Sequence, residues 1–163
     1  MLAFPSDVEY YAGIGSRRAP PDALSIVGDT AKLLLQADMW LRSGGADGCD
    51  TAFEDNSGDK KEIFLASDAQ VWAINEAKKY SNAYWPHVRP FVKQLLGRNV
   101  MIILGRDGLH PVKFVVCWTF GGGDVGGTGH GIRCAKAHGI PVYNLFNDRA
   151  RFYREVIVER LGV

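Results

Sequence analysis

The fold is indicated most clearly by the stretch VKFVVCWTFGGGDVGGTGHG, residues 112–131. An apolar run that ends at Trp118 is followed by seven glycines between positions 121 and 131. This order is typical of α/β proteins, in which a buried strand leads through a glycine-rich loop into a helix. Residues without a Cβ let backbone N–H groups close around an anion, and the helix that follows adds unpaired N–H groups and its positive dipole end. The stretch therefore predicts a phosphate-binding loop and, with it, a nucleotide-type ligand.

Apolar runs and amphipathic stretches alternate along the rest of the chain, which is the pattern of repeated βα units and a parallel sheet. Five strands are predicted, at residues 9–14, 39–42, 62–66, 112–118 and 141–145. Helices are predicted at residues 20–35, 49–54, 69–79, 88–96, about 131–137 and 148–161, with an unassigned apolar run at 100–104. Right-handed crossovers give the strand order 3-2-1-4-5. We expect one domain, residues 1–163, with a Rossmann-like three-layer α/β/α architecture and a mainly parallel sheet of about five strands.

Composition narrows the classes of protein to consider. Lys and Arg total 19 against 18 for Asp and Glu, so the chain lacks the strongly basic character typical of non-specific polyanion binding. Cys49, Cys117 and Cys134 form no CxxC pair and are expected to be reduced, buried thiols of a cytoplasmic protein. No apolar stretch approaches the ~20 residues of a membrane span, and residues 1–7 show no signal-peptide pattern. No Cys/His cluster is present, so we expect no metal. We also expect no cofactor and, since no span is found, no membrane partner.

Three predicted strands, the first, second and fourth, end in glycine-rich loops that meet at the carboxyl edge of such a sheet. In the first loop the guanidinium of Arg17 is suited to holding a phosphate bidentately. In the third loop the Thr128 hydroxyl and the N–H groups of residues 126–129 form a second anion cradle, to which His130 can donate. The candidate ligand-binding residues of the three loops are Gly15, Ser16, Arg17, Ser43, Gly44, Gly45, Ala46, Asp47, Gly126, Gly127, Thr128, Gly129 and His130.

Acidic residues follow the second loop. Asp50 and Glu54 are spaced i, i+4 and share one helix face, where a carboxylate can bind ribose hydroxyls or act as the acid/base of glycosidic cleavage. A helix N-terminus also favours acids through its dipole, and this second interpretation covers Asp47 and Asp50 better than Glu54. Asp50 stays a ligand-binding candidate beside this dipole interpretation. Glu54 is the leading acid/base candidate, because it lies later in the helix, where the dipole interpretation is weaker.

Four motifs resemble, in this order, those of DNA-processing protein A (DprA/Smf). They are YAGIGSR at 11–17, SGGADGCD at 43–50, GRN at 97–99, and GGT at 126–128 before IPV at 140–142. Over residues 9–146 the chain is similar to a small stand-alone member of the DprA-like branch of the SLOG superfamily, which includes the cytokinin-activating LOG phosphoribohydrolases. The resemblance implies a Rossmann-like fold, a ligand or base contact at the Arg98-Asn99 pair, a catalytic role for Arg98 if the protein is an enzyme, and a homo-oligomer.

The expected function is that of a nucleotide-binding protein of the DprA-like type, which holds a nucleotide or nucleotide-derived ligand. One alternative is a nucleoside 5′-monophosphate N-glycosidase similar to the LOG enzymes. Their PGGxGTxxE motif places its Glu at the position of Gly131, so Glu54 would have to replace it. The other alternative is a single-stranded-DNA-binding recombination mediator similar to DprA. Whether the ligand is turned over is left open by the residues.

Overall fold

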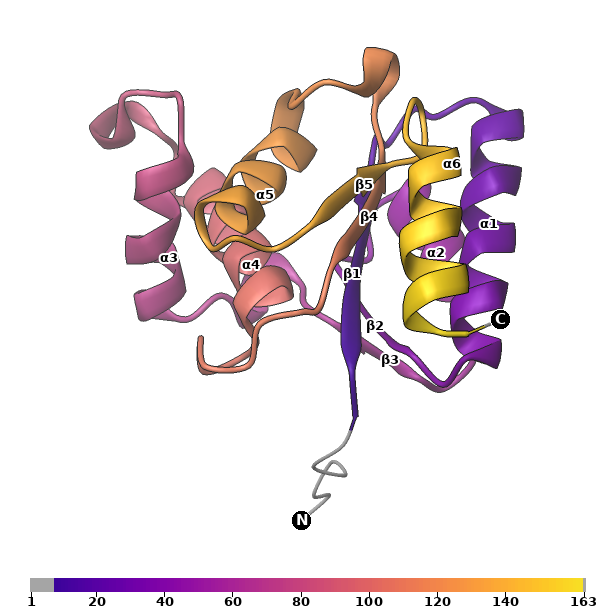
Figure 1. Ribbon diagram of the computed structural model, residues 1–163. Helices are drawn as coiled ribbons and strands as arrows, with labels where there is room; N and C mark the ends of the chain where they lie inside the picture. Colours follow the sequence, from indigo (N-terminus) through magenta and orange to yellow (C-terminus); the bar gives the residue numbers. More distant parts are fainter. Residues whose placement is uncertain (1–7, 163) are drawn as a thin grey trace.

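Five parallel strands form one sheet in the order β3-β2-β1-β4-β5, as Figure 1 shows for the computed structural model, which describes residues 8–162. The strands are β1 (Tyr10–Gly15), β2 (Trp40–Ser43), β3 (Lys61–Ile63), β4 (Val115–Trp118) and β5 (Val142–Asn144). Neighbouring strands are in parallel register, with Ala12 beside Arg42 on one side and beside Val115 on the other. The predicted fold class and strand order are confirmed.

Helices cover both faces of the sheet. They are α1 (Pro21–Gln36), α2 (Cys49–Asp55), α3 (Val71–Ala77), α4 (Pro90–Leu104), α5 (Gly126–Ala137) and α6 (Arg149–Phe152), which continues as a π-helical segment (Tyr153–Arg160). Short 3-10 turns lie at Ala66–Asp68, Lys78–Tyr80, Trp85–His87 and Phe120–Gly122. In Figure 1, α1, α2 and α6 lie on one side of the sheet, and α3, α4 and α5 lie on the other. The three-layer arrangement is the one expected from alternating βα units.

Two hydrophobic cores, one on each face, hold the layers together. Successive residues of β4 alternate between them: Val116 and Trp118 pack with α1 and α6, whereas Val115 and Cys117 pack with α4 and α5. Burial on both faces is characteristic of central parallel strands. All three cysteines are free and buried, as predicted. No helix within residues 8–162 is long and apolar enough to cross a membrane.

Two helices differ from the sequence prediction. Helix α4 runs without interruption from Pro90 to Leu104, although a break was predicted after residue 96. Gly97 lies inside it because α3 packs closely there, and a Cβ on Gly97 would stand 2.7 Å from the Ile74 side chain. Helix α5 begins at Gly126, whereas the sequence predicted a start near residue 131. Much of the expected glycine loop is thus the first turn of a helix, because packing outweighs the low helix propensity of glycine.

The remaining boundaries shift by a few residues. The third strand ends at Ile63, the fourth begins at Val115, and the last predicted helix divides into an α-helical turn and the π-helical segment. The prediction for residues 1–7 lies outside the described part of the chain.

Candidate functional site at the carboxyl edge of the sheet

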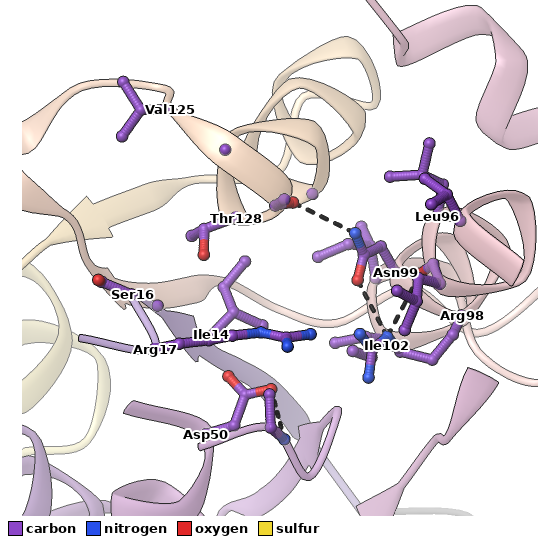
Figure 2. Close-up of a pocket in the computed structure, with 18 of the residues that line it drawn as sticks. Ile14, Ser16, Arg17, Asp50, Leu96, Arg98, Asn99, Ile102, Val125 and Thr128 are labelled. Carbon is purple, nitrogen blue, oxygen red and sulfur yellow. Dashed lines mark hydrogen bonds between the residues drawn. The ribbon is translucent and has the colours of Figure 1, made fainter. Parts of the chain in front are cut away.

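A cavity of about 400 Å³ opens at the carboxyl end of β1, between α4 and α5 (Figure 2). The connections from β1 and β4 leave this edge toward opposite faces of the sheet, since α1 and α5 lie on different sides. Ligands of open α/β sheets bind at such a topological switch point. The volume lies within the range of small-molecule sites.

The cavity has one apolar wall and one polar wall. The apolar residues come mainly from α4 and β1: Ile14, Val92, Leu95, Leu96, Ile102, Ile103 and Val125. The polar and glycine residues come from the strand ends, α4 and the start of α5: Gly15, Ser16, Arg17, Arg18, Ala46, Asp50, Arg98, Asn99, Gly126, Gly127, Thr128 and Gly131. A flat apolar group and an anionic group therefore find suitable surroundings in one cavity.

The loop after β1 supplies two cationic side chains. Arg17 and Arg18 are exposed, and no carboxylate of residues 8–162 forms an ion pair with either of them. Figure 2 shows the Arg17 side chain extending into the cavity near Asp50. The backbone N–H of Ser16 is already used, because it donates to the Trp118 carbonyl at 3.0 Å. The guanidinium groups of Arg17 and Arg18 are thus the available anion-binding groups of this loop.

The first turn of α5 faces the same cavity. Residues Gly126, Gly127 and Thr128 line it, and no side chain caps this helix end. The backbone N–H groups of a first helical turn have no partner within the helix and carry the positive end of its dipole. Gly126 has φ +62°, a conformation that L side chains rarely adopt. The glycines therefore shape the start of a helix rather than an open loop.

Arg98 connects α4 with the loop after β2. The residue is 7 % exposed, and Nη1 donates to the Gly44 carbonyl at 2.7 Å and to the Phe64 carbonyl at 3.4 Å. Its Nε donates to the Asn99 side chain at 3.1 Å. A Cβ on Gly44 would overlap this Nη1, so a side chain at position 44 would displace the guanidinium. Arg98 lines the cavity, yet these donors are taken by the protein itself.

Asp50 is a buried carboxyl group on the cavity wall. It is 6 % exposed, and Oδ2 accepts a hydrogen bond from the Ala46 N–H at 3.4 Å. Burial raises the pKa of Asp50 to about 6, and the positive charge of Arg98 opposes part of this effect. The carboxyl group therefore changes charge slightly below neutral pH, and it does so on the wall of the cavity.

His130 lies behind the cavity wall and not on it. It is 1 % exposed, and Nε2 donates to the Ala77 carbonyl at 2.9 Å. This hydrogen bond assigns the proton to Nε2, which leaves Nδ1 to accept from the Asn99 side-chain nitrogen at 3.5 Å. That nitrogen also donates to the Gly127 carbonyl at 3.2 Å. His130 thus positions Asn99, whereas the sequence suggested a direct anion contact, because the ring turns toward the end of α3.

The structure brings together most of the predicted site residues but not all of them. Those on the cavity wall are Gly15, Ser16, Arg17, Ala46, Asp50, Arg98, Asn99, Gly126, Gly127 and Thr128. Those that do not line it are Ser43, Gly44, Gly45, Asp47, Glu54, Gly129 and His130. The Ser43 hydroxyl donates to the Gly13 carbonyl at 2.6 Å, inside the sheet.

Glu54 forms an ion pair with Lys61 at 3.3 Å, away from the cavity, although it shares a helix with Asp50. The seven-residue α2 aims its first turn, not its second, at the site. Within residues 8–162, no three His, Cys, Asp or Glu side chains are grouped in a way that would hold a metal ion.

The apolar wall is the part that sequence reasoning missed. Val92, Leu95 and Ile102 lie three and seven residues apart, which places them on one face of a helix, the face that also carries the predicted Asn99. The signal was present but was divided at Gly97, where the helix was predicted to stop. Arg18 was also missed, because nothing in the sequence distinguishes it from a solvated arginine next to Arg17.

Fold and site define a Rossmann-like α/β protein with a mixed apolar and cationic cavity at its switch point. Among solved structures, the chain is similar to DNA processing protein A from Helicobacter pylori, with a TM-score of 0.60, 18 % identity, and coverage of 94 % of this chain and 77 % of that one. It is also similar to DNA processing protein A (DprA) from Streptococcus pneumoniae, with a TM-score of 0.58, 18 % identity, and coverage of 94 % of this chain and 56 % of that one. The H. pylori structure is described as revealing a unique single-stranded DNA binding mode of that protein.

No family model and no curated protein matches the sequence. The similarity to the two solved structures establishes a DprA-like Rossmann-like fold.

Proposed function

We propose that this protein binds a nucleotide unit in the cavity at the carboxyl edge of its sheet. The observation that supports this proposal is that the Arg17 guanidinium, which forms no ion pair within residues 8–162, and the first turn of α5, which no side chain caps, face the same cavity as the apolar wall of α4. The guanidinium and the first-turn N–H groups are suited to bind a phosphate, and the apolar wall is suited to contact the face of a base.

The proposed arrangement assigns a task to each wall. The phosphate lies between Arg17 and the first-turn N–H groups of α5, where the Thr128 hydroxyl adds a donor. The base lies against Leu95 and Ile102 of α4. Asp50 and Asn99 also line the cavity, and their side chains are suited to hydrogen bonds with the sugar hydroxyls and with the polar edge of the base.

A second candidate is that the nucleotide unit belongs to single-stranded DNA. It is favoured by the similarity to the H. pylori protein, whose structure is described in terms of single-stranded DNA binding. A formal net charge of +1 gives no broad basic surface, so binding of a DNA strand would depend on a few local contacts such as Arg17 and Arg18.

Fluorescence anisotropy with labelled dT12, competed by dTMP and AMP, tests the proposal and separates the two candidates. Arg17→Ala should weaken binding about 10- to 150-fold, since hydrogen bonds to charged groups contribute about 1.5–3 kcal/mol. The matched control is Lys113→Ala, which removes an exposed cation at the opposite edge of the sheet, next to the amino end of β4. Equal affinities of wild type and Arg17→Ala for every nucleotide ligand would refute the proposal.

Chromatography of the same mixtures addresses turnover. Release of free base from AMP would support the N-glycosidase alternative, and Asp50 would then be the carboxyl group placed at the cavity. Unchanged nucleotide after incubation would support binding alone. Light scattering during size-exclusion chromatography tests the expected homo-oligomer.

A further inference from the structure

One cation on the cavity wall has no task in the proposed function. Arg18 lines the cavity and is exposed, and no carboxylate of residues 8–162 forms an ion pair with it. The backbone before it is fixed on two sides, because the Ser16 N–H donates to the Trp118 carbonyl at 3.0 Å and the Ser16 carbonyl accepts the Cys49 N–H at 3.2 Å. A fixed backbone lowers the entropy cost of holding a ligand at Arg18.

The charges on the cavity wall do not cancel. The described residues of the wall include three arginines and one carboxyl group. Burial raises the pKa of Asp50 and lowers that of Arg98, and the charge of each opposes this effect on the other, so these two charges offset each other. Arg17 and Arg18 remain, and the first turn of α5 adds the positive end of a helix dipole, about half an elementary charge. The cavity is therefore suited to a ligand that carries several negative charges.

The first turn of α5 also leaves open space beside its backbone. Gly126 and Gly127 line the cavity and are exposed, and a Cβ on either would meet no atom within 4 Å. Gly126 is explained by its positive φ, and Gly129 by close packing, since its Cβ would overlap the Asp124 backbone. Neither reason applies to Gly127 within residues 8–162. A bare backbone at this position lets an anion approach the helix N–H groups closely.

We infer that Arg18 and the backbone of Gly126 and Gly127 bind a second phosphoryl group, so that the ligand is a nucleoside that carries a diphosphate. This inference rests on the proposed function, in which Arg17 and Thr128 hold the first phosphoryl group. A phosphate monoester offers three terminal oxygens, whereas bidentate contacts with two arginines engage up to four acceptor positions. A terminal diphosphate offers five such oxygens and a bridging diphosphate offers four, which leaves acceptors for both arginines and the helix N–H groups.

Isothermal titration calorimetry with AMP and ADP, in buffer without metal ions, compares one phosphoryl group with two. Wild type should bind ADP about 10- to 150-fold more tightly than AMP, the factor that one hydrogen bond to a charged group supplies. Arg18→Ala should lose this preference, because ADP affinity falls to that of AMP while AMP affinity stays unchanged. Arg154→Ala is the matched control, since it removes an exposed arginine from the π-helical segment, on the face of the sheet opposite to α4 and α5.

Gly127→Ala gives a second, independent measurement. The added methyl group meets no protein atom, so the thermal unfolding curve should not shift to lower temperature. ADP affinity should fall, because the Cβ occupies space that the inference assigns to the second phosphoryl group. A stable variant that binds ADP as tightly as wild type does would overturn the inference.

The outcomes separate this inference from the proposed function. If wild type binds neither AMP nor ADP, the proposed function fails and the inference fails with it. If Arg17→Ala weakens AMP binding but wild type binds ADP no more tightly than AMP, the function stands and the second phosphoryl position is refuted. Equal losses of AMP and ADP affinity in Arg18→Ala would also refute it, because Arg18 would then act on the first phosphoryl group. ADP-glucose distinguishes the two kinds of diphosphate: affinity equal to that of ADP supports a bridging group, and weaker affinity supports a terminal one.

Discussion

The buried carboxyl group of Asp50 makes the stability of this protein depend on pH in an unusual direction. Its pKa is raised from 3.8 to about 6 by burial, so the folded protein holds a proton between these values that the unfolded chain has already released. The free energy of unfolding therefore falls as pH rises through this window, by about 1.4 kcal/mol per unit of pKa difference. Over roughly two units this amounts to about 3 kcal/mol, fully lost above the pKa of the folded state.

Asp50→Asn removes this titration while it keeps a side-chain oxygen for the Ala46 N–H. Relative to wild type, the variant should gain about 3 kcal/mol of unfolding free energy between about pH 4 and pH 7. For a chain of this size that difference corresponds to a relative change in melting temperature of about 6–12 °C. The quantity to follow is the difference between the two proteins, because other carboxyl groups affect both of them equally.

Urea denaturation followed by circular dichroism at several pH values between 4 and 7 measures this difference. Asp47→Asn is the matched control, since it neutralises an exposed carboxylate in the loop that precedes α2. Parallel stability curves for wild type and Asp50→Asn would refute the reasoning, because they would show that the Asp50 carboxyl group is not desolvated in the folded protein.

Three further predictions concern the surroundings of the site. Gly15→Ala should destabilise the protein by about 1–3 kcal/mol in urea denaturation, because its Cβ would stand 2.6 Å from the Cys49 side chain; unchanged stability would show that α2 can move away. All three thiols are buried, with pKa values raised by desolvation, so Ellman's reagent at pH about 8 should label none of them in the native protein and all of them in urea, whereas fast native labelling would contradict the packing. Glu54→Gln should leave nucleotide affinity unchanged in anisotropy, because Glu54 pairs with Lys61 outside the cavity; a large loss would return this carboxylate to the site.

The sheet and the edge at which the cavity opens were predictable from local patterns. Apolar runs such as the one ending at Trp118 alternate with amphipathic helices, and right-handed crossovers leave few strand orders for five parallel strands. The carboxyl ends of β1, β2 and β4 must then lie at one edge. For this reason the sequence predicts Arg17, Asp50 and Thr128 as site residues, and all three line the cavity.

The limits of helices that contain glycine were not predictable in the same way. Gly97 predicts a helix break from its local propensity, yet α4 continues through it. The residue is glycine because Ile74 packs so closely there that no side chain fits. The first turn of α5 likewise contains glycines where propensity predicts a loop. In both places contacts with distant residues outweigh a local preference of about 1 kcal/mol for each glycine.

The sequence by itself determined the α/β class, the strand order and the edge of the sheet at which the glycine-rich loops meet, because these follow from hydrophobic periodicity and from the handedness of βαβ crossovers. Only the tertiary structure decided which side chains reach the cavity. His130 turns toward Ala77, and Arg98 reaches back to the Gly44 carbonyl. Their orientation depends on hydrogen-bond partners 53 and 54 residues away along the chain. Buried polar groups must find such partners wherever the fold supplies them, and no local pattern of residues contains that information.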